Sequence, residues 1–106
     1  MLYLSMYLGR PVLDASNRPV GKVLDLIARL DGDYPLVVGV RVKTGTRAHR
    51  DVDWADVRAF EISQVILARE AGALPALVLQ DRDVLLARHV LDKQIVDLED
   101  RRLIRV

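Results

Sequence analysis

Cysteine is absent from the 106-residue chain, and aromatic residues make up only 5% of it. Without cysteine the chain has no disulfide bond, no thiolate nucleophile and no cysteine-ligated zinc, which fits a reducing compartment. Hydrophobic residues still make up 51%, so Val, Leu, Ile and Ala must fill the core. We therefore expect one domain with a modest aliphatic core.

Neither sign of charge dominates, because 16 Lys and Arg face 15 Asp and Glu for a net charge of +1. This balance provides no broad field for phosphate backbones, so nucleic-acid binding needs a local patch. No apolar run approaches the roughly 20 residues that cross a bilayer, and the segment 1–4 lacks a signal-peptide pattern. We expect a soluble cytoplasmic domain, which a longer chain could tether to a membrane protein.

Alternation of apolar and polar residues predicts mainly β structure. The clearest strand is 36–43, where Leu36, Val38, Val40 and Val42 alternate with a more polar set, and Gly39 indicates a bend or bulge. The segment 20–30 fits two structures: helical spacing selects Val20, Val23, Leu24, Ile27 and Leu30, whereas strand spacing selects Val20, Leu24, Leu26, Ala28 and Leu30. Turn signals at 16–19 and 31–33 favour the strand.

The C-terminal region predicts a short helix followed by a hairpin. Asp81 is placed to cap a helix over 82–91, and 93–97 and 101–106 form a strand pair about a turn at 99–100. We therefore divide the chain into a β domain at 1–80 and a helix with a β-hairpin at 81–106.

An internal repeat links the two ends of the chain. The segment 8–23 (LGRPVLDASNRPVGKV) aligns without gaps to 91–106 (LDKQIVDLEDRRLIRV). Leu, Asp, Arg and Val are identical at Leu8/Leu91, Asp14/Asp97, Arg18/Arg101 and Val23/Val106. Because Val106 closes the chain inside an apolar strand pattern, we expect the chain to be cut from a longer protein with a second copy.

These residues carry a family resemblance. The segment LGRPVLDASNRPVGKVLDLIARLDG resembles the start of a PRC-barrel domain, with Gly21, Lys22, Val23 and Asp25 at the positions of its Gly-Lys-Val-x-Asp motif. Asn17 stands where the family usually has a turn glycine, and Asn tolerates the left-handed conformation. The block DVDWADV resembles a Val-x-Trp-x-x-Val element, and LLARHVLDKQIVDLEDRRLIRV resembles the linker and renewed hairpin of tandem units.

The resemblance implies a small PRC-type β-barrel with a short helix before the C-terminal β-hairpin. It implies a non-catalytic interaction module, cytoplasmic and part of a larger magnesium-transporter-associated protein, that binds a protein partner or itself as a homodimer. The alternative is an accessory barrel of a ribosomal-RNA maturation factor that binds ribosomal protein or RNA. Fold alone does not decide between them. We expect the interaction surface at Trp54 and at the C-terminal hairpin, with Lys93, Ile95, Arg101, Leu103 and Arg105.

No residue set specifies a reaction, a cofactor or a metal. His49 and His89 lack neighbours at ligand spacing. The acidic pairs Asp31/Asp33, Asp51/Asp53 and Asp81/Asp83 lack a complete calcium-loop pattern, and Asp14, Asp25 and Asp97 suit turns and strand edges better than catalysis. A basic cluster of Arg41, Lys43, Arg47 and Arg50 near Trp54 admits a nucleic-acid surface, although Asp51 and Asp53 oppose its charge.

Overall fold

The chain is mainly β, as the alternation predicts, and no helix reaches seven residues in the part that the structure describes. The computed structural model describes residues 2–30, 36–89, 94–97 and 102–105, with side chains for 5–30 and 36–87. The strands are β1 (Leu2–Tyr3), β2 (Pro11–Leu13), β3 (Pro19–Arg29), β4 (Leu36–Gly45), β5 (Ala48–Asp53), β6 (Val57–Phe60), β7 (Val65–Leu67), β8 (Asp83–Leu85), β9 (Gln94–Asp97) and β10 (Arg102–Arg105). Three 3₁₀ turns, η1 (Leu4–Met6), η2 (Trp54–Asp56) and η3 (Ala71–Ala73), and one short helix, α1 (Leu86–His89), complete the described elements.

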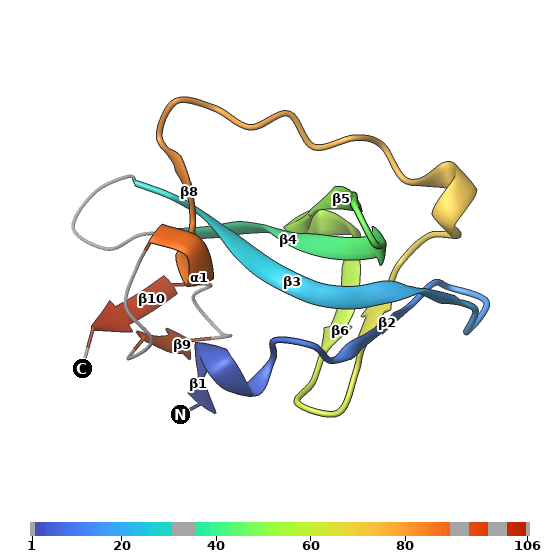
Figure 1. Cartoon of the computed structure of the whole chain (residues 1–106), viewed down its shortest axis with the longest axis horizontal. Coiled ribbons are helices and arrows are strands. Elements are labelled where there is room, and N and C mark those ends of the chain that lie inside the picture. Colours follow the sequence, from blue (N-terminus) through green and yellow to red (C-terminus); the bar gives the residue numbers. More distant parts are fainter. Residues whose placement is uncertain (1, 31–35, 90–93, 98–101, 106) are drawn as a thin grey trace.

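The long antiparallel pair β3–β4 is the centre of the fold (Figure 1). β2 and β8 pair with the two ends of β3, and β5 pairs with β4. β7 lies parallel to β2 and antiparallel to β6. The segment 20–30 is thus a strand, and the helical alternative is excluded.

The sheet curls but does not close into a barrel, so the predicted closed PRC-type barrel is not confirmed. The chain passes from β5 to β6 through the single turn η2, although these strands lie at opposite ends of the order β5-β4-β3-β2-β7-β6. Their inner residues share one core, which joins Val52 of β5 to Val57 and Phe60 of β6. The sheet therefore wraps around its core without hydrogen bonds between its end strands.

The core is aliphatic, as the composition predicts. Its buried residues come from all the central strands: Val12, Val23, Leu26, Ala28, Val37, Val40, Val42, Val52, Val65, Leu67, Leu74 and Leu86. Tyr7 stacks on Phe60 with ring centroids 4.4 Å apart, and Trp54 tilts against the same ring at 5.1 Å. The scarce aromatics therefore gather at one edge of the core.

Two β-bulges interrupt the central pair. Val23 faces Val42 and Asp25 faces Arg41, so Leu24 is an extra residue in β3. Further along, Ile27 faces Gly39 and Ala28 faces Val37, so Val38 is extra in β4. The strict alternation predicted for 36–43 is therefore wrong at its start, and the irregularity indicated at Gly39 is confirmed.

Two positions near the first turn depend on backbone geometry. Asn17 has φ 62°, the left-handed conformation that Asn tolerates. A Cβ at Gly21 would clash with the carbonyl oxygen of Lys43, so the close approach of β3 to β4 requires glycine there.

The predicted helix over 82–91 is wrong in its first half. Residues 83–85 form β8, which pairs with β3, and α1 covers only Leu86–His89. Asp83, rather than Asp81, accepts a hydrogen bond from a backbone N–H group, that of Gln80, at 2.8 Å. Tertiary pairing with β3 has overridden the local capping pattern.

The C-terminal hairpin joins the same sheet, with β9 paired to β1 and β10 paired to the start of β4 (Figure 1). At two rungs its register repeats that of the first hairpin, at the 83-residue offset of the repeat. Pro11 faces Lys22 as Gln94 faces Arg105, and Val12 faces Gly21 as Ile95 faces Ile104. Within the described residues, no helix is long and apolar enough to cross a membrane.

Candidate functional site

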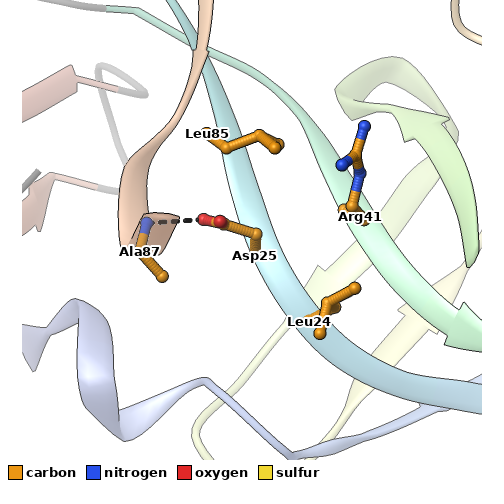
Figure 2. A pocket seen from close by; sticks show the side chains of 5 residues that line it. All are labelled: Leu24, Asp25, Arg41, Leu85 and Ala87. Carbon is orange, nitrogen blue, oxygen red and sulfur yellow. Dashed lines mark hydrogen bonds between the residues drawn. The ribbon is translucent and has the colours of Figure 1, made fainter. Parts of the chain in front are cut away.

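An open hollow lies on the outer face of β3 and β4, opposite the main core and next to a second buried cluster of Ile27, Val38 and Leu85. Its lining comes from Leu24 and Asp25 on β3, Arg41 on β4, Leu85 at the end of β8 and Ala87 in α1 (Figure 2). Leu24 is there because the bulge adds a residue to β3, and its side chain stays 43% exposed. A large apolar side chain is thus held in the open on a well-packed strand.

Asp25 is the buried polar residue of this hollow, only 4% exposed. Its Oδ1 accepts hydrogen bonds from the backbone N–H of Leu26 at 2.8 Å and of Ala87 at 2.7 Å. The second bond ties α1 to β3 across the sheet face, as Figure 2 shows. Asp25 therefore acts as a structural clamp that holds Leu85 and Ala87 over the strand.

Arg41 on β4 pairs with Asp25 on β3 and, on its other side, with Asp51 on β5. The three residues form one row, or rung, across the sheet. Nε and Nη2 of Arg41 donate to the two carboxylate oxygens of Asp51 at 2.8 and 3.0 Å. Hydrogen bonding to the carboxylate of Asp51, together with the charges of Asp51 and Asp25, raises the pKa of Arg41 despite its burial. This row of Asp25, Arg41 and Asp51, the middle rung, is therefore a paired structural element.

The adjacent rung toward the β4–β5 turn differs in charge. Lys22, Lys43 and His49 face one another across β3, β4 and β5, and all three are exposed. Two further open hollows flank this rung: one shares Leu24 with the first hollow and includes Lys43, Arg47 and His49, and the other includes Lys22 and Lys43. We call Leu24, Lys22, Lys43, Arg47 and His49 the outer-face surface.

The basic cluster predicted from the sequence is divided by the structure. Arg41 is bound to Asp51, and Arg50 donates to the carbonyl oxygens of Ala71 and Leu74 at 2.7 and 2.6 Å. Lys43 and Arg47 remain on the exposed face. The cluster therefore combines two structural arginines with two accessible cations.

Trp54 lies in η2, partly buried against the core and the ring of Phe60. The interaction surface expected at Trp54 therefore involves a ring that is already partly packed within the fold. Ile95, Leu103 and Arg105 lie on β9 and β10, whose side chains are outside the described part of the structure. Lys93 and Arg101 lie outside the described residues, so the interaction role of this hairpin stays a prediction.

The remaining acidic residues of the described core are engaged with backbone or arginine. Oδ1 of Asp14 accepts from the N–H groups of Arg18 and Ser16, each at 2.9 Å, and these bonds, that from Arg18 above all, lower the pKa of Asp14. Asp56 accepts from Arg69 at 2.8 Å, and Asp53 accepts from the N–H of Ala55 at 2.9 Å. The ordinary turn role that the sequence suggests for Asp14 is confirmed.

No group of three or more His, Asp or Glu residues converges in the described ranges. Of the acidic pairs considered in the sequence, Asp31 and Asp33 lie outside the described residues. Asp51 and Asp83 are bound to Arg41 and Arg29. Each of the described pairs therefore has one member already committed to an arginine.

Leu24 and Lys22 were not among the predicted site residues, whereas Lys43 belonged to the predicted basic cluster and His49 was considered only as a metal ligand. The signal was present in the mixed periodicity of 20–30, because Val23 fits only the helical set and Leu26 fits only the strand set. Both lie in the core, because Leu24 is an extra residue between them and so changes the alternation.

No protein-family model matches the chain, and no curated protein matches it in sequence.

Proposed function

We propose that this chain is a non-catalytic module that binds a protein partner, and that Leu24 marks the contact face. The carrying observation is a leucine, 43% exposed, that a β-bulge presents beside an open hollow. Bulges re-aim side chains where a strand meets a partner. A rigid strand also loses little conformational entropy on binding, which favours a defined contact.

The use of the buried acidic groups supports a non-catalytic role. Asp14, Asp25 and Asp56 are each bound to backbone N–H groups or to arginine, so their carboxylates stabilise the fold. A general base must instead reach a substrate proton with its lone pairs. The hollow beside Asp25 has Leu24 and Leu85 as its other prominent walls, which suits docking better than chemistry.

The arrangement also supports a PRC-type module. The first strand, the turn at Asn17 and the long second strand carrying Gly21, Lys22 and Val23 occur in the order of that family's motif. The curled sheet with an aliphatic core suits the same architecture. We propose an open version of it, in the cytoplasm and within a larger magnesium-transporter-associated protein.

The partner is another protein or a second copy of the chain. The C-terminal hairpin is paired within the chain, since β9 contacts β1 and β10 contacts β4. We therefore assign a homodimer contact to the outer-face surface rather than to this hairpin.

One observation favours the alternative of an RNA-maturation accessory module. The exposed rung of Lys22, Lys43 and His49 gives a local basic patch on a chain with balanced charge. Such a patch is the minimum that phosphate contacts need. It predicts RNA binding that weakens steeply with salt.

Photocrosslinking in cells tests the proposed function. The photoreactive residue benzoylphenylalanine replaces Leu24 in one variant and Ile62, which is 39% exposed, in the matched control. We expect one defined polypeptide, identified by mass spectrometry, to crosslink at position 24 and not at position 62.

Three outcomes separate the readings. A crosslink between two copies of the chain establishes self-association, and sedimentation should then show a concentration-dependent dimer. RNA recovered at position 24 supports the alternative. Equal crosslinking at both positions, or none at position 24, refutes a docking role for Leu24.

A further inference from the structure

We propose that the outer-face surface binds an extended acidic segment of the partner, whose carboxylates meet the basic rung while one apolar side chain packs on Leu24. This inference rests on the proposed function and specifies the chemistry of the partner. It is carried by the charge of one rung, the placement of one leucine and the continuity of three hollows.

The first observation is that like charges face each other across β3 and β4. Lys22 lies directly opposite Lys43, and His49 is the next residue on the rung. Like charges directly opposite in a sheet destabilise it. Within the described residues, no ion pair neutralises this rung, whereas the adjacent rung pairs Arg41 with Asp51. An acidic ligand would supply the missing counter-charge.

The second observation is the continuity of the surface. Leu24 borders both the hollow that contains Asp25 and the one that contains Lys43 and His49, and Lys43 also borders the third. A ligand that contacts the basic rung therefore reaches Leu24 without leaving the face. Neighbouring strands lie about 4.8 Å apart and alternate side chains of an extended chain about 7 Å apart, so the long lysine side chains can reach acidic residues at alternating positions.

The surroundings favour a carboxylate peptide over RNA. Asp25 and Asp51 flank Arg41 on the rung next to Lys43, and their two charges outweigh its one. A continuous phosphate backbone would pass over both of them. Among the residues whose side chains are described, the rings of Tyr7, Trp54 and Phe60 pack on one another at the core edge, so none is an open stacking platform beside the basic rung.

Binding of a defined probe tests the proposal. The probe is a short fluorescein-labelled peptide in which Glu alternates with Leu, measured by fluorescence anisotropy with the whole chain. We compare the unmodified chain with Lys22→Glu/Lys43→Glu and with Arg58→Glu/Arg82→Glu. The second pair makes the same charge change at two exposed residues that line none of the three hollows.

We expect the first double variant to bind about tenfold or more weakly, because reversed charges repel the probe. The control should change binding less than about twofold, since screening weakens distant charges. A Lys22→Gln/Lys43→Gln variant serves if charge reversal disturbs folding, and it should weaken binding by an intermediate factor. A second peptide, with Gln in place of Glu, is measured with the unmodified chain. Its affinity should be no higher than the affinity of the Lys22→Gln/Lys43→Gln variant for the Glu probe.

Several results would overturn the proposal. These are equal loss in both double variants, tight binding of the Gln peptide, or a poly-uridine oligonucleotide that binds more tightly than the probe at physiological salt. If crosslinking at Leu24 succeeds while the affinity for the probe does not depend on Lys22 and Lys43, then Leu24 is a docking residue and the partner segment is not recognised by its acidic residues. If crosslinking at Leu24 also fails, the proposed function itself is wrong.

Discussion

Two neighbouring rungs on the outer face of β3, β4 and β5 share the same strands and differ in how their charge is compensated. In the middle rung, Arg41 lies between Asp25 and Asp51 and binds the latter through two hydrogen bonds. In the rung toward the β4–β5 turn, Lys22 faces Lys43 with His49 beside them. Paired charge on this sheet thus contributes to the fold, whereas charge without an ion pair can serve a partner.

The largest test of this comparison contrasts the two faces of one strand. Leu26 is fully buried and Leu24 is 43% exposed on the same strand β3. Leu26→Ala should lower the free energy of unfolding by about 3 kcal/mol, because it leaves a cavity. Leu24→Ala should change it by less than about 0.5 kcal/mol, as surface changes do. Urea unfolding of both variants measures this, and similar losses would mean that Leu24 belongs to the core.

Asp51→Asn breaks the middle rung. Arg41 and Asp51 have side chains only 11% and 12% exposed, so the variant leaves a mostly buried guanidinium without its partner. We expect a loss of about 2 kcal/mol, below the cost of a fully buried pair. Lys43→Gln, the matched change on the basic rung, should leave the unfolding free energy nearly unchanged. If both variants unfold alike, the rungs do not differ in role.

The pH dependence of the unfolding free energy should come from carboxylates that are paired with arginine, such as Asp83, and not from the basic rung. Burial raises the pKa of Asp83, but hydrogen bonds from Arg29 and from the Gln80 N–H outweigh it, so its pKa is lowered. A lowered pKa in the fold adds stability that is present above the unfolded value, about 3.9, and disappears as the pH falls through the folded value. Asp83→Asn should therefore flatten the loss of stability below about pH 4. Thermal melts from pH 2 to 7 measure it, and an unchanged acid limb would contradict the assignment.

Tyr7 provides a smaller test on the core side. Its hydroxyl is buried and has no hydrogen-bond partner among the described residues, and burial raises its pKa. Tyr7→Phe keeps the ring that stacks on Phe60 and removes the unpaired group. We expect a gain of up to about 1 kcal/mol in unfolding free energy. A loss would show that the hydroxyl has a partner.

The smallest effect is expected from Lys22→Glu, which places opposite charges across from each other on the basic rung. It should raise the unfolding free energy by roughly 0.5 kcal/mol. The same variant should weaken binding of the acidic probe. A variant that is both more stable and a weaker binder would show that the lysine pair lowers the stability of the fold and supports binding.

Much of the β architecture can be predicted from the sequence, because strand alternation and turn residues act locally. The hairpin around Asn17 and the strand pair at the C-terminus follow from them. The bulges could not be placed in advance. A single extra residue at Leu24 shifts the face of every residue beyond it, and periodicity read over 20–30 then mixes two registers.

The prediction of a helix over 82–91 was wrong for a different reason. Residues 83–85 pair with β3, which lies more than 50 residues earlier in the chain, and no local pattern reports such a partner. The candidate site was only partly predicted, for the same reason. Lys22, Lys43 and His49 are scattered in sequence, and only the register of three strands makes them neighbours.

The bulge at Leu24 also has a consequence for how such a surface could arise in evolution. Removal of that single residue would restore regular pairing, with Val23 still opposite Val42 and Asp25 still opposite Arg41. The core would keep its contacts while the exposed leucine disappeared. A one-residue insertion or deletion in a strand usually scrambles its faces, yet at this position it would add or delete a contact point alone. Related chains could therefore gain or lose this docking face in one genetic step without refolding.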